Sequence, residues 1–169
     1  MRKHIFLIGM MGCGKSTIGK LLSRQLSCSF IDLDEEIVRY EGRSIPEIFA
    51  DVGDSGFRLC ETAALRCVID EAPCVIATGG GIVTREENIA LMHNAGIVLW
   101  LNRPLEDMIA DVRQDTRPNL SGDKEARMRT LFAQREALYR SAAHCIFDNS
   151  QPPEQSAQDI AALLKDQLL

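Results

Sequence analysis

A glycine-rich segment near the N-terminus has the residue types and spacing of a phosphate-binding loop. Residues 9–16 read Gly-Met-Met-Gly-Cys-Gly-Lys-Ser and fit the P-loop pattern G-x-x-x-x-G-K-[ST] at every fixed position. In such a loop the backbone N–H groups surround phosphate oxygens, while a lysine reaches the β- and γ-phosphates and a hydroxyl binds Mg²⁺. We expect these two roles of Lys15 and Ser16. The other predicted phosphate contacts are Gly12, Cys13, Gly14 and Thr17.

Two carboxylates, Asp32 and Asp34, lie at the end of the second apolar run of the chain. Alternation along a strand would point both the same way, out of the sheet edge where ligands bind in α/β folds. In one interpretation Asp34 is simply the N-cap of a helix that follows. In the other, which a neighbouring P-loop favours, Asp32 binds metal-bound water and Asp34 orients an acceptor hydroxyl.

Three consecutive glycines, Gly79, Gly80 and Gly81, follow the apolar run at 75–77. Each glycine costs backbone entropy on folding, and one would be enough for a turn. Three at the end of a strand indicate that a ligand approaches the backbone closely. We therefore expect this loop to line a binding site.

Two arginines have both a functional and a plain interpretation. Arg58 shares a helix face with Glu61, and Arg135 lies near Glu136 and Tyr139. Either arginine could belong to a surface ion pair, which contributes only tenths of a kcal/mol. Neither arginine decides the function by itself.

The polar, turn-rich segment at 115–123 contains Arg117 and lies between two predicted helices. It is either a surface loop or a mobile lid. The P-loop elsewhere in the chain favours the lid, because phosphoryl-transfer enzymes close such segments over their substrates.

Short apolar runs alternate with helical patterns along the whole chain. Each run is apolar on successive residues, which is typical of strands buried on both faces of a parallel sheet. We predict an α/β fold, a doubly wound five-stranded parallel sheet with helices on both faces. It forms a single domain over residues 1–169, with a lid at about 114–124. The five predicted strands are at 5–8, 30–33, 75–77, 97–101 and 145–147.

Local signals mark several helix boundaries. The segments 44–47 and 84–87 read as capping boxes, Ser-x-x-Glu and Thr-x-x-Glu, that open helices. Gly96 is expected to end the second of these helices. The residues predicted to face inward from the last helix are Ile160, Leu163 and Leu164.

Composition excludes several classes of protein. The chain has 169 residues, 46% of them apolar and 25% charged, with a net charge of −5. It lacks the basic balance of nucleic-acid binders and any apolar stretch of membrane-helix length. The N-terminal apolar run is too short for a signal peptide, so we expect a cytoplasmic protein. The six cysteines form no C-x-x-C pair, and we expect them, Cys60 and Cys67 included, to pack as small apolar residues.

Taken together, the motifs resemble those of the shikimate kinase family. Besides the P-loop and Asp-x-Asp, the chain has Gly-Phe-Arg-x-x-Glu at 56–61, Ala-Thr-Gly-Gly-Gly at 77–81, Arg-Pro at 117–118 and Arg-x-x-x-Tyr at 135–139. Their order and spacing match over nearly the whole chain. The resemblance implies transfer of the γ-phosphoryl group of ATP, with Mg²⁺, to the 3-hydroxyl of shikimate, a step in aromatic amino acid biosynthesis. It implies ATP and shikimate as the only partners and a monomeric enzyme.

The resemblance also assigns roles to individual residues. Asp34 would hold the substrate hydroxyl and accept its proton, while Ser16 and Asp32 share Mg²⁺, Asp32 through water. Arg117 would move in with the lid to face the γ-phosphate, which makes Lys15, Asp34 and Arg117 the catalytic set.

The acceptor would be bound by a second set of residues. Arg58 and Arg135 would hold the shikimate carboxylate in guanidinium forks. Phe49 and Phe57 would contact the ring. The glycines that would offer backbone groups to the ring hydroxyls are Gly79, Gly80 and Gly81.

Two positions depart from the family pattern. Asn119 stands in the lid where the family often has leucine, and Ala110 where it often has an arginine that stacks on adenine. Arg113, one helical turn on, is a candidate substitute.

Two other functions remain as alternatives. One is a related P-loop kinase that acts on gluconate or a nucleoside monophosphate. The other is a nucleotide switch without an acceptor pocket, in which Arg58 and Arg135 are plain surface residues.

Overall fold

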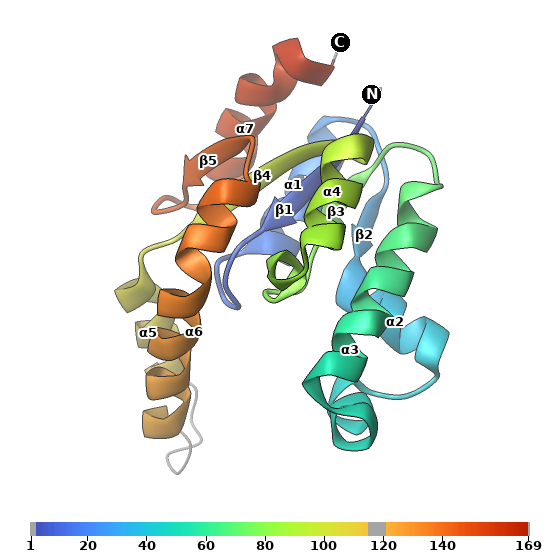
Figure 1. Ribbon diagram of the computed structural model, residues 1–169. Coiled ribbons are helices and arrows are strands. Elements are labelled where there is room, and N and C mark those ends of the chain that lie inside the picture. Colours follow the sequence, from blue (N-terminus) through green and yellow to red (C-terminus); the bar gives the residue numbers. More distant parts are fainter. Residues whose placement is uncertain (1–2, 115–120, 169) are drawn as a thin grey trace.

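The computed structural model describes residues 3–114 and 121–168 and has the predicted five-stranded parallel sheet (Figure 1). The strand order is β2-β3-β1-β4-β5, and every neighbouring pair is parallel. Arg117, Asn119 and most of the predicted lid at 114–124 lie outside the described residues. The strands are β1 (His4–Ile8), β2 (Phe30–Asp32), β3 (Val75–Ala77), β4 (Gly96–Asn102) and β5 (Cys145–Asp148).

Burial of the strands follows their position in the sheet. All five residues of β1 are buried, as are the first six of β4, since helices cover both faces of these central strands. The edge strand β5 alternates between exposed and half-buried residues. The continuous apolar runs thus predicted the central strands correctly.

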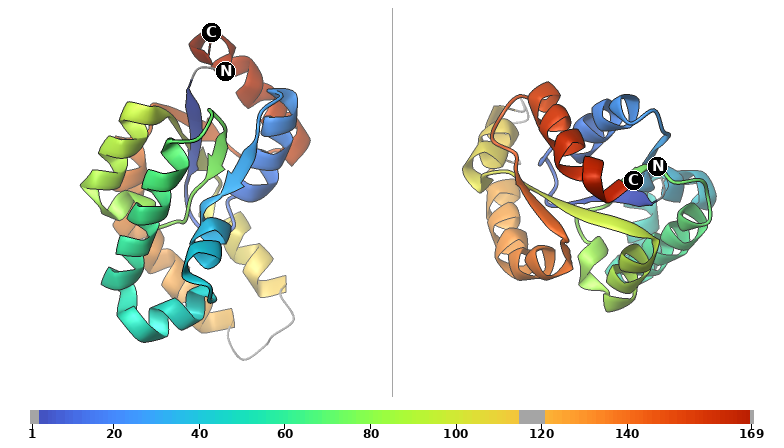
Figure 2. Two further views of the ribbon diagram at one scale, coloured as in Figure 1. Left: turned by 90° about the vertical axis from the view of Figure 1, so that its right-hand side faces the viewer. Right: turned by 90° about the horizontal axis from the view of Figure 1, so that it is seen from above.

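Helices pack on both faces of the sheet, which confirms the doubly wound architecture. Helices α1 and α7 lie on one face, and α4 and α6 lie on the other (Figure 2). A 3₁₀ turn, η1 (Ile82–Thr84), joins β3 to α4. The helices are α1 (Lys15–Gln25), α2 (Leu33–Glu41), α3 (Ile45–Ile69), α4 (Glu86–Ala95), α5 (Leu105–Gln114), α6 (Ser121–Ala142) and α7 (Pro153–Leu168).

The start of α3 agrees with the predicted capping box. Glu47 Oε2 accepts hydrogen bonds from the backbone N of Ser44 at 2.7 Å and from its hydroxyl at 2.6 Å. Within α3, Gly53 interrupts the helix with φ 67° and ψ −173°. The residues from Asp54 onward therefore form a separate helical segment, which carries Phe57, Arg58 and Glu61 toward the site.

The second predicted capping box is wrong. Thr84 ends the 3₁₀ turn, where its hydroxyl donates to the carbonyl of Gly81 at 2.7 Å. Helix α4 begins at Glu86, so its N-cap is Arg85 and not Thr84, and no side chain caps it. The prediction that this helix ends before Gly96 is confirmed. Glycine is needed at this position because β4 starts here beside β1, and a Cβ would lie 2.2 Å from the His4 carbonyl oxygen.

Two expectations about buried residues are also wrong. In α7, Ile160 and Leu164 are fully buried, but Leu163 is 47% exposed. Cys13 and Cys74 are buried, and Cys28, Cys60 and Cys145 pack half-buried against the core, as expected, but Cys67 in α3 is exposed. No helix in the described residues is long and apolar enough to cross a membrane.

Candidate active site

The P-loop connects β1 to α1, and its glycines are needed for its shape. Gly9, Gly12 and Gly14 have φ of 140°, 79° and 98°, in the region that side chains rarely adopt. A Cβ at Gly9 would also lie 2.8 Å from the Leu101 carbonyl oxygen. Lys15 begins α1, so the first N–H groups of that helix point into the loop.

The ammonium group of Lys15 lies over its own loop. Nζ donates to the carbonyl oxygens of Gly9 and Met10, each at 2.8 Å. Backbone N–H groups, the helix N-terminus and this cation together form a site for a polyphosphate. The cavity above the loop, which we call the P-loop cavity, has a volume of about 320 Å³.

Ser16 and Asp32 are in contact and both line the P-loop cavity. The Ser16 hydroxyl donates to Asp32 Oδ2 at 2.6 Å, and Asp32 Oδ1 accepts from the backbone N of Asp34 at 3.1 Å. The N-cap of α2 is therefore Asp32 and not Asp34, which lies in the first turn. A hydroxyl and a carboxylate are the hard oxygen donors that Mg²⁺ prefers, so this pair fits a magnesium site.

Asp34 lines both the P-loop cavity and a second one. Burial raises the pKa of its carboxyl group above the ordinary value, and the nearby charge of Asp32 adds to this effect. Lys15 and Arg58 act in the opposite direction. A carboxylate made more basic in this way suits a group that accepts a proton.

The second cavity, of about 270 Å³, has two aromatic rings on its wall, and we call it the aromatic cavity. The rings of Phe49 and Phe57 stack with centroids 4.3 Å apart at 25°. Arg58 and Arg135 line the same cavity, so the structure brings all the predicted acceptor contacts together. The predicted contacts lining this cavity are Asp34, Phe49, Phe57, Arg58, Gly79, Gly80, Gly81 and Arg135.

The ion pair between Arg58 and Glu61 is buried, contrary to the surface-pair interpretation. Arg58 Nη1 lies 2.5 Å from Glu61 Oε2, and the two side chains are 12% and 1% exposed. Arg58 Nη2 also donates to Asp54 at 3.1 Å. Burial raises the pKa of the Glu61 carboxyl, while Arg58 opposes the shift. Sequence reasoning missed Glu61 as a site residue because its spacing from Arg58 is equally common on helix surfaces.

The triple-glycine loop packs directly against this ion pair. A Cβ at Gly79 would lie 2.5 Å from Glu61 Oε1, and a Cβ at Gly81 would lie 2.2 Å from Arg58 Nη1. At two of three positions, the close approach that the glycines allow is therefore made by the protein's own side chains. At Gly80 a Cβ would make only ordinary contacts, the nearest being with the backbone N of Met11 at 3.5 Å and with Arg135 Nη1 at 3.6 Å.

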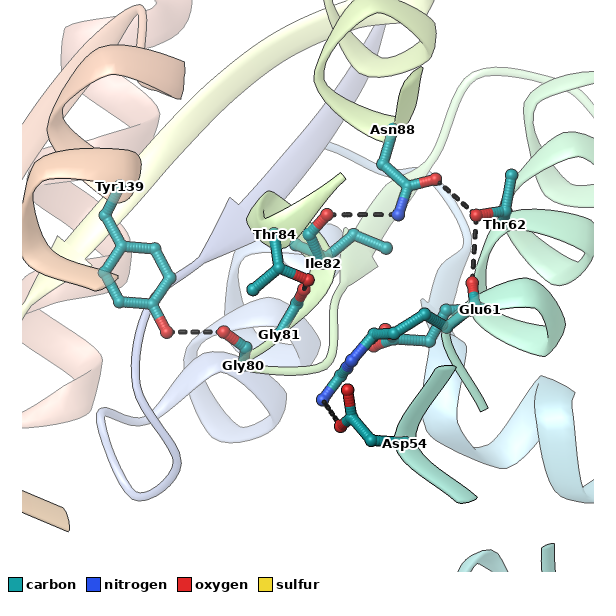
Figure 3. Close-up of polar contacts among 10 residues, drawn as sticks. Asp54, Glu61, Thr62, Gly80, Gly81, Ile82, Thr84, Asn88 and Tyr139 are labelled. Carbon is teal, nitrogen blue, oxygen red and sulfur yellow. Dashed lines mark hydrogen bonds and ion pairs between the residues drawn. The ribbon is translucent and has the colours of Figure 1, made fainter. Parts of the chain in front are cut away.

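Helix α6 supports the loop from the other side. The buried Tyr139 donates its hydroxyl to the Gly80 carbonyl at 2.5 Å (Figure 3). Burial raises the pKa of Tyr139 to about 12, so the hydroxyl stays protonated as a donor. The suspected partner of Arg135, Glu136, instead pairs with Arg140 at 3.3 Å. Arg135 lines the aromatic cavity, and its charge lowers the pKa of the Glu61 carboxyl.

A buried polar network fixes the far end of the loop. The Thr62 hydroxyl donates to Asn88 Oδ1 at 2.8 Å, and Asn88 Nδ2 donates to the Ile82 carbonyl at 3.1 Å (Figure 3). These bonds tie α3, α4 and η1 together behind the glycines. No sequence motif indicated them, because both residue types are also common on surfaces.

A third cavity, of about 370 Å³, adjoins the P-loop on its other side, and we call it the outer cavity. Asn149, which follows β5, is buried at its floor and donates to the Cys13 carbonyl at 2.7 Å. Ser156 in turn donates to Asn149 Oδ1 at 2.7 Å. The sequence analysis missed Asn149. The residues lining the outer cavity are Gly12, Cys13, Gly14, Thr17, Ile18, Arg103, Asn149, Gln151 and Pro153.

Comparison with known proteins agrees with this geometry. The model of the shikimate kinase family matches residues 11–165. A shikimate kinase of Nitrosospira multiformis is 41% identical over 164 residues, which are 95% of this chain and 84% of that protein. The solved shikimate kinase from Acinetobacter baumannii, in complex with shikimate, has a TM-score of 0.87 at 35% identity and covers 99% of this chain and 96% of its own.

A gluconokinase from Sinorhizobium meliloti, with a TM-score of 0.64 at 18% identity, shares the fold alone. It covers 99% of this chain and 95% of its own. Identity near 40% over almost the full length, together with the family match, shows that the chain belongs to the shikimate kinase family, ATP-dependent kinases that phosphorylate shikimate.

Proposed function

We propose that this chain transfers the γ-phosphoryl group of ATP to the 3-hydroxyl of shikimate, giving shikimate 3-phosphate and ADP. The observation that carries the proposal is the junction of the P-loop cavity and the aromatic cavity. Met11, Asp34 and Gly80 line both, so a phosphate on the loop and an acceptor among the arginines would meet beside the Asp34 carboxylate. In-line transfer needs this juxtaposition.

The P-loop cavity would hold the triphosphate. Lys15 would exchange its carbonyl partners for phosphate oxygens, and the backbone N–H groups from Gly12 to Thr17 would bind the remaining ones. Ser16 and Asp32 would hold Mg²⁺, Asp32 through water, and the ion would neutralise charge on the phosphates. The arrangement fixes the donor before any chemistry occurs.

The aromatic cavity would hold the acceptor by its carboxylate and its ring. Arg58 and Arg135 would bind the carboxylate, and the stacked rings of Phe49 and Phe57 would contact the apolar ring face. The acceptor hydroxyl would then point at Asp34, which accepts its proton as the bond to phosphorus forms. The raised pKa of Asp34 favours this transfer.

Further features of the proposal concern the lid, the cell compartment and assembly. Arg117 is proposed to face the γ-phosphate when the lid closes, and it lies outside the described residues. A monomeric enzyme is part of the same proposal. We place the enzyme in the cytoplasm, where ATP is supplied.

The test is ADP release from Mg-ATP with shikimate, gluconate, nucleoside monophosphates or no acceptor. We expect about 1–100 turnovers per second with shikimate alone, the range typical of kinases. A faster rate with gluconate would favour the related sugar-acid kinase. Equal slow rates in all reactions would mean that the aromatic cavity binds no acceptor and would favour the nucleotide switch.

A further inference from the structure

Arg103 occupies an unusual position beside the P-loop. It lies between β4 and α5, and its Nη1 donates to the carbonyl oxygen of Gly12 at 2.9 Å. The same nitrogen lies 2.6 Å from Asp111 Oδ2 of α5. The contact with Gly12 joins residues 91 positions apart in the sequence, and the side chain is 25% exposed. The guanidinium is therefore anchored from two sides at the rim of the outer cavity.

The anchoring leaves part of the guanidinium available. Within the part of the chain that the structure describes, both polar contacts of Arg103 use Nη1. A guanidinium has five N–H donors and two flat faces, so Nε, Nη2 and the faces can still engage a ligand. Arg103 is also the only charged side chain among the described residues that line the outer cavity.

The position of the outer cavity indicates which part of a ligand it receives. The P-loop cavity shares Asp34 and Gly80 with the aromatic cavity, and it shares Gly12, Gly14 and Thr17 with the outer cavity. If the γ-phosphate faces the acceptor, the nucleoside must leave the loop on the opposite side. That side is the outer cavity.

We propose that Arg103 is a nucleotide-binding residue that holds the nucleoside half of ATP through the free donors and the flat face of its guanidinium. This inference rests on the proposed function. The ion pair between Arg103 and Asp111 also links Arg103 to α5, the helix that leads directly to the predicted lid. Arg103 is not a catalytic residue, so its loss should change nucleotide affinity and leave acceptor affinity unaltered.

Two variants of the full chain test the inference, with Mg²⁺ present throughout. Arg103→Lys keeps a cation that can reach Gly12 and Asp111 but lacks the flat fork, and Arg103→Met removes the charge as well. By titration calorimetry we expect the Kd for ADP to rise about fivefold in the lysine variant and about tenfold in the methionine variant, as for loss of hydrogen bonds to a charged group. The Kd for shikimate should stay within twofold in both.

Inorganic tripolyphosphate distinguishes a contact with the nucleoside from a contact with the phosphates that the P-loop binds. It contacts the P-loop without a nucleoside, so its affinity for Arg103→Lys should stay within twofold of wild type. Equal losses for tripolyphosphate and ADP in that variant would overturn the inference, because Arg103 would then act on the P-loop itself. ADP affinity within twofold of wild type in both variants would also overturn it.

A control variant and the wild-type protein distinguish failure of the proposed function from failure of the role of Arg103. Arg39→Met removes an exposed arginine paired with Glu36 and away from all three cavities, and it should leave ADP affinity unchanged. Wild-type protein that failed to bind ADP would contradict the proposed function. Wild-type protein that binds ADP, with no effect of either Arg103 variant, would contradict only the role of Arg103.

Discussion

Replacing Arg58 by methionine tests whether this arginine both neutralises the buried Glu61 and binds the acceptor. Methionine keeps much of the volume of the arginine stem but leaves Glu61 without its partner, while Glu61 is only 1% exposed. The other partner of Arg58, Asp54, is 72% exposed and can return to water. The energetic consequence should therefore fall on Glu61, because an unpaired carboxylate cannot remain ionised in such a place without a large penalty.

The loss of unfolding free energy in Arg58→Met has an upper limit, because Glu61 can take up a proton on folding and become neutral. That uptake costs about 1.36 kcal/mol for each pH unit above the ordinary pKa of 4.5 for this carboxyl. The upper limit is about 3.4 kcal/mol at pH 7 and about 0.7 kcal/mol at pH 5. We expect Arg58→Met to lower the free energy of unfolding by about 2–3 kcal/mol at pH 7, and by less than about 1 kcal/mol at pH 5.

The assay is urea unfolding of wild type, Arg58→Met and the double variant Arg58→Met/Glu61→Met at both pH values. The double variant removes the buried charge and should recover most of the stability. Arg39→Met breaks an exposed pair with Glu36, also three residues apart, and should leave the urea midpoint unchanged. A pH-independent loss, or a double variant less stable than Arg58→Met, would refute the reasoning.

The same variant has a kinetic consequence. Losing one of two guanidinium groups should raise the KM for shikimate, at a cost of about 2–5 kcal/mol in kcat/KM, and leave the KM for ATP unchanged. An unaltered kcat/KM for shikimate would show that the carboxylate is bound elsewhere.

Four further predictions concern the phosphate side of the site. Asp34→Asn should lower kcat about 10²–10⁴-fold in steady-state assays while shikimate still binds, and a fall of less than tenfold would exclude Asp34 as the base. In wild type, kcat/KM should fall as the pH drops through the pKa of Asp34, which burial and Asp32 raise above 3.8, and this acid limb should vanish from the residual activity of Asp34→Asn. Asn149→Ala removes the donor to Cys13, so it should cost about 1–3 kcal/mol of stability in urea and raise the KM for ATP, and unchanged values of both would contradict its role behind the loop. Chelation of Mg²⁺ should abolish turnover and its return should restore it, whereas full activity without the ion would exclude the Ser16 and Asp32 site.

Much of the fold follows from local patterns in the sequence. The run at 5–8 is apolar on every residue, and its short length and the glycine that follows it favour a strand covered on both faces. The P-loop could be predicted equally well, because its conformation requires glycine at Gly9, Gly12 and Gly14 and leaves few alternatives. Both signals lie within a few neighbouring residues, so the strand and the P-loop can be predicted without knowledge of the packing.

Predictions about single helix positions were less successful. Thr84 has a residue type that caps helices, but its hydroxyl bonds back into the 3₁₀ turn, and Leu163 is an apolar residue at the edge of the buried face of α7. In both cases a neighbouring element decides the outcome, and the local pattern is the same either way.

The sequence by itself determined the phosphate loop, the parallel sheet and the family of this protein, because residue type and spacing specify them within a few positions of one another. Only the tertiary structure decided that Arg58 and Glu61 are buried and that Arg103 reaches Gly12. Their spacing is equally compatible with a solvated surface. The packing of α3 against the glycine loop, and of the segment after β4 against the P-loop, gives these charges their partners, and contacts so distant in sequence leave no local pattern.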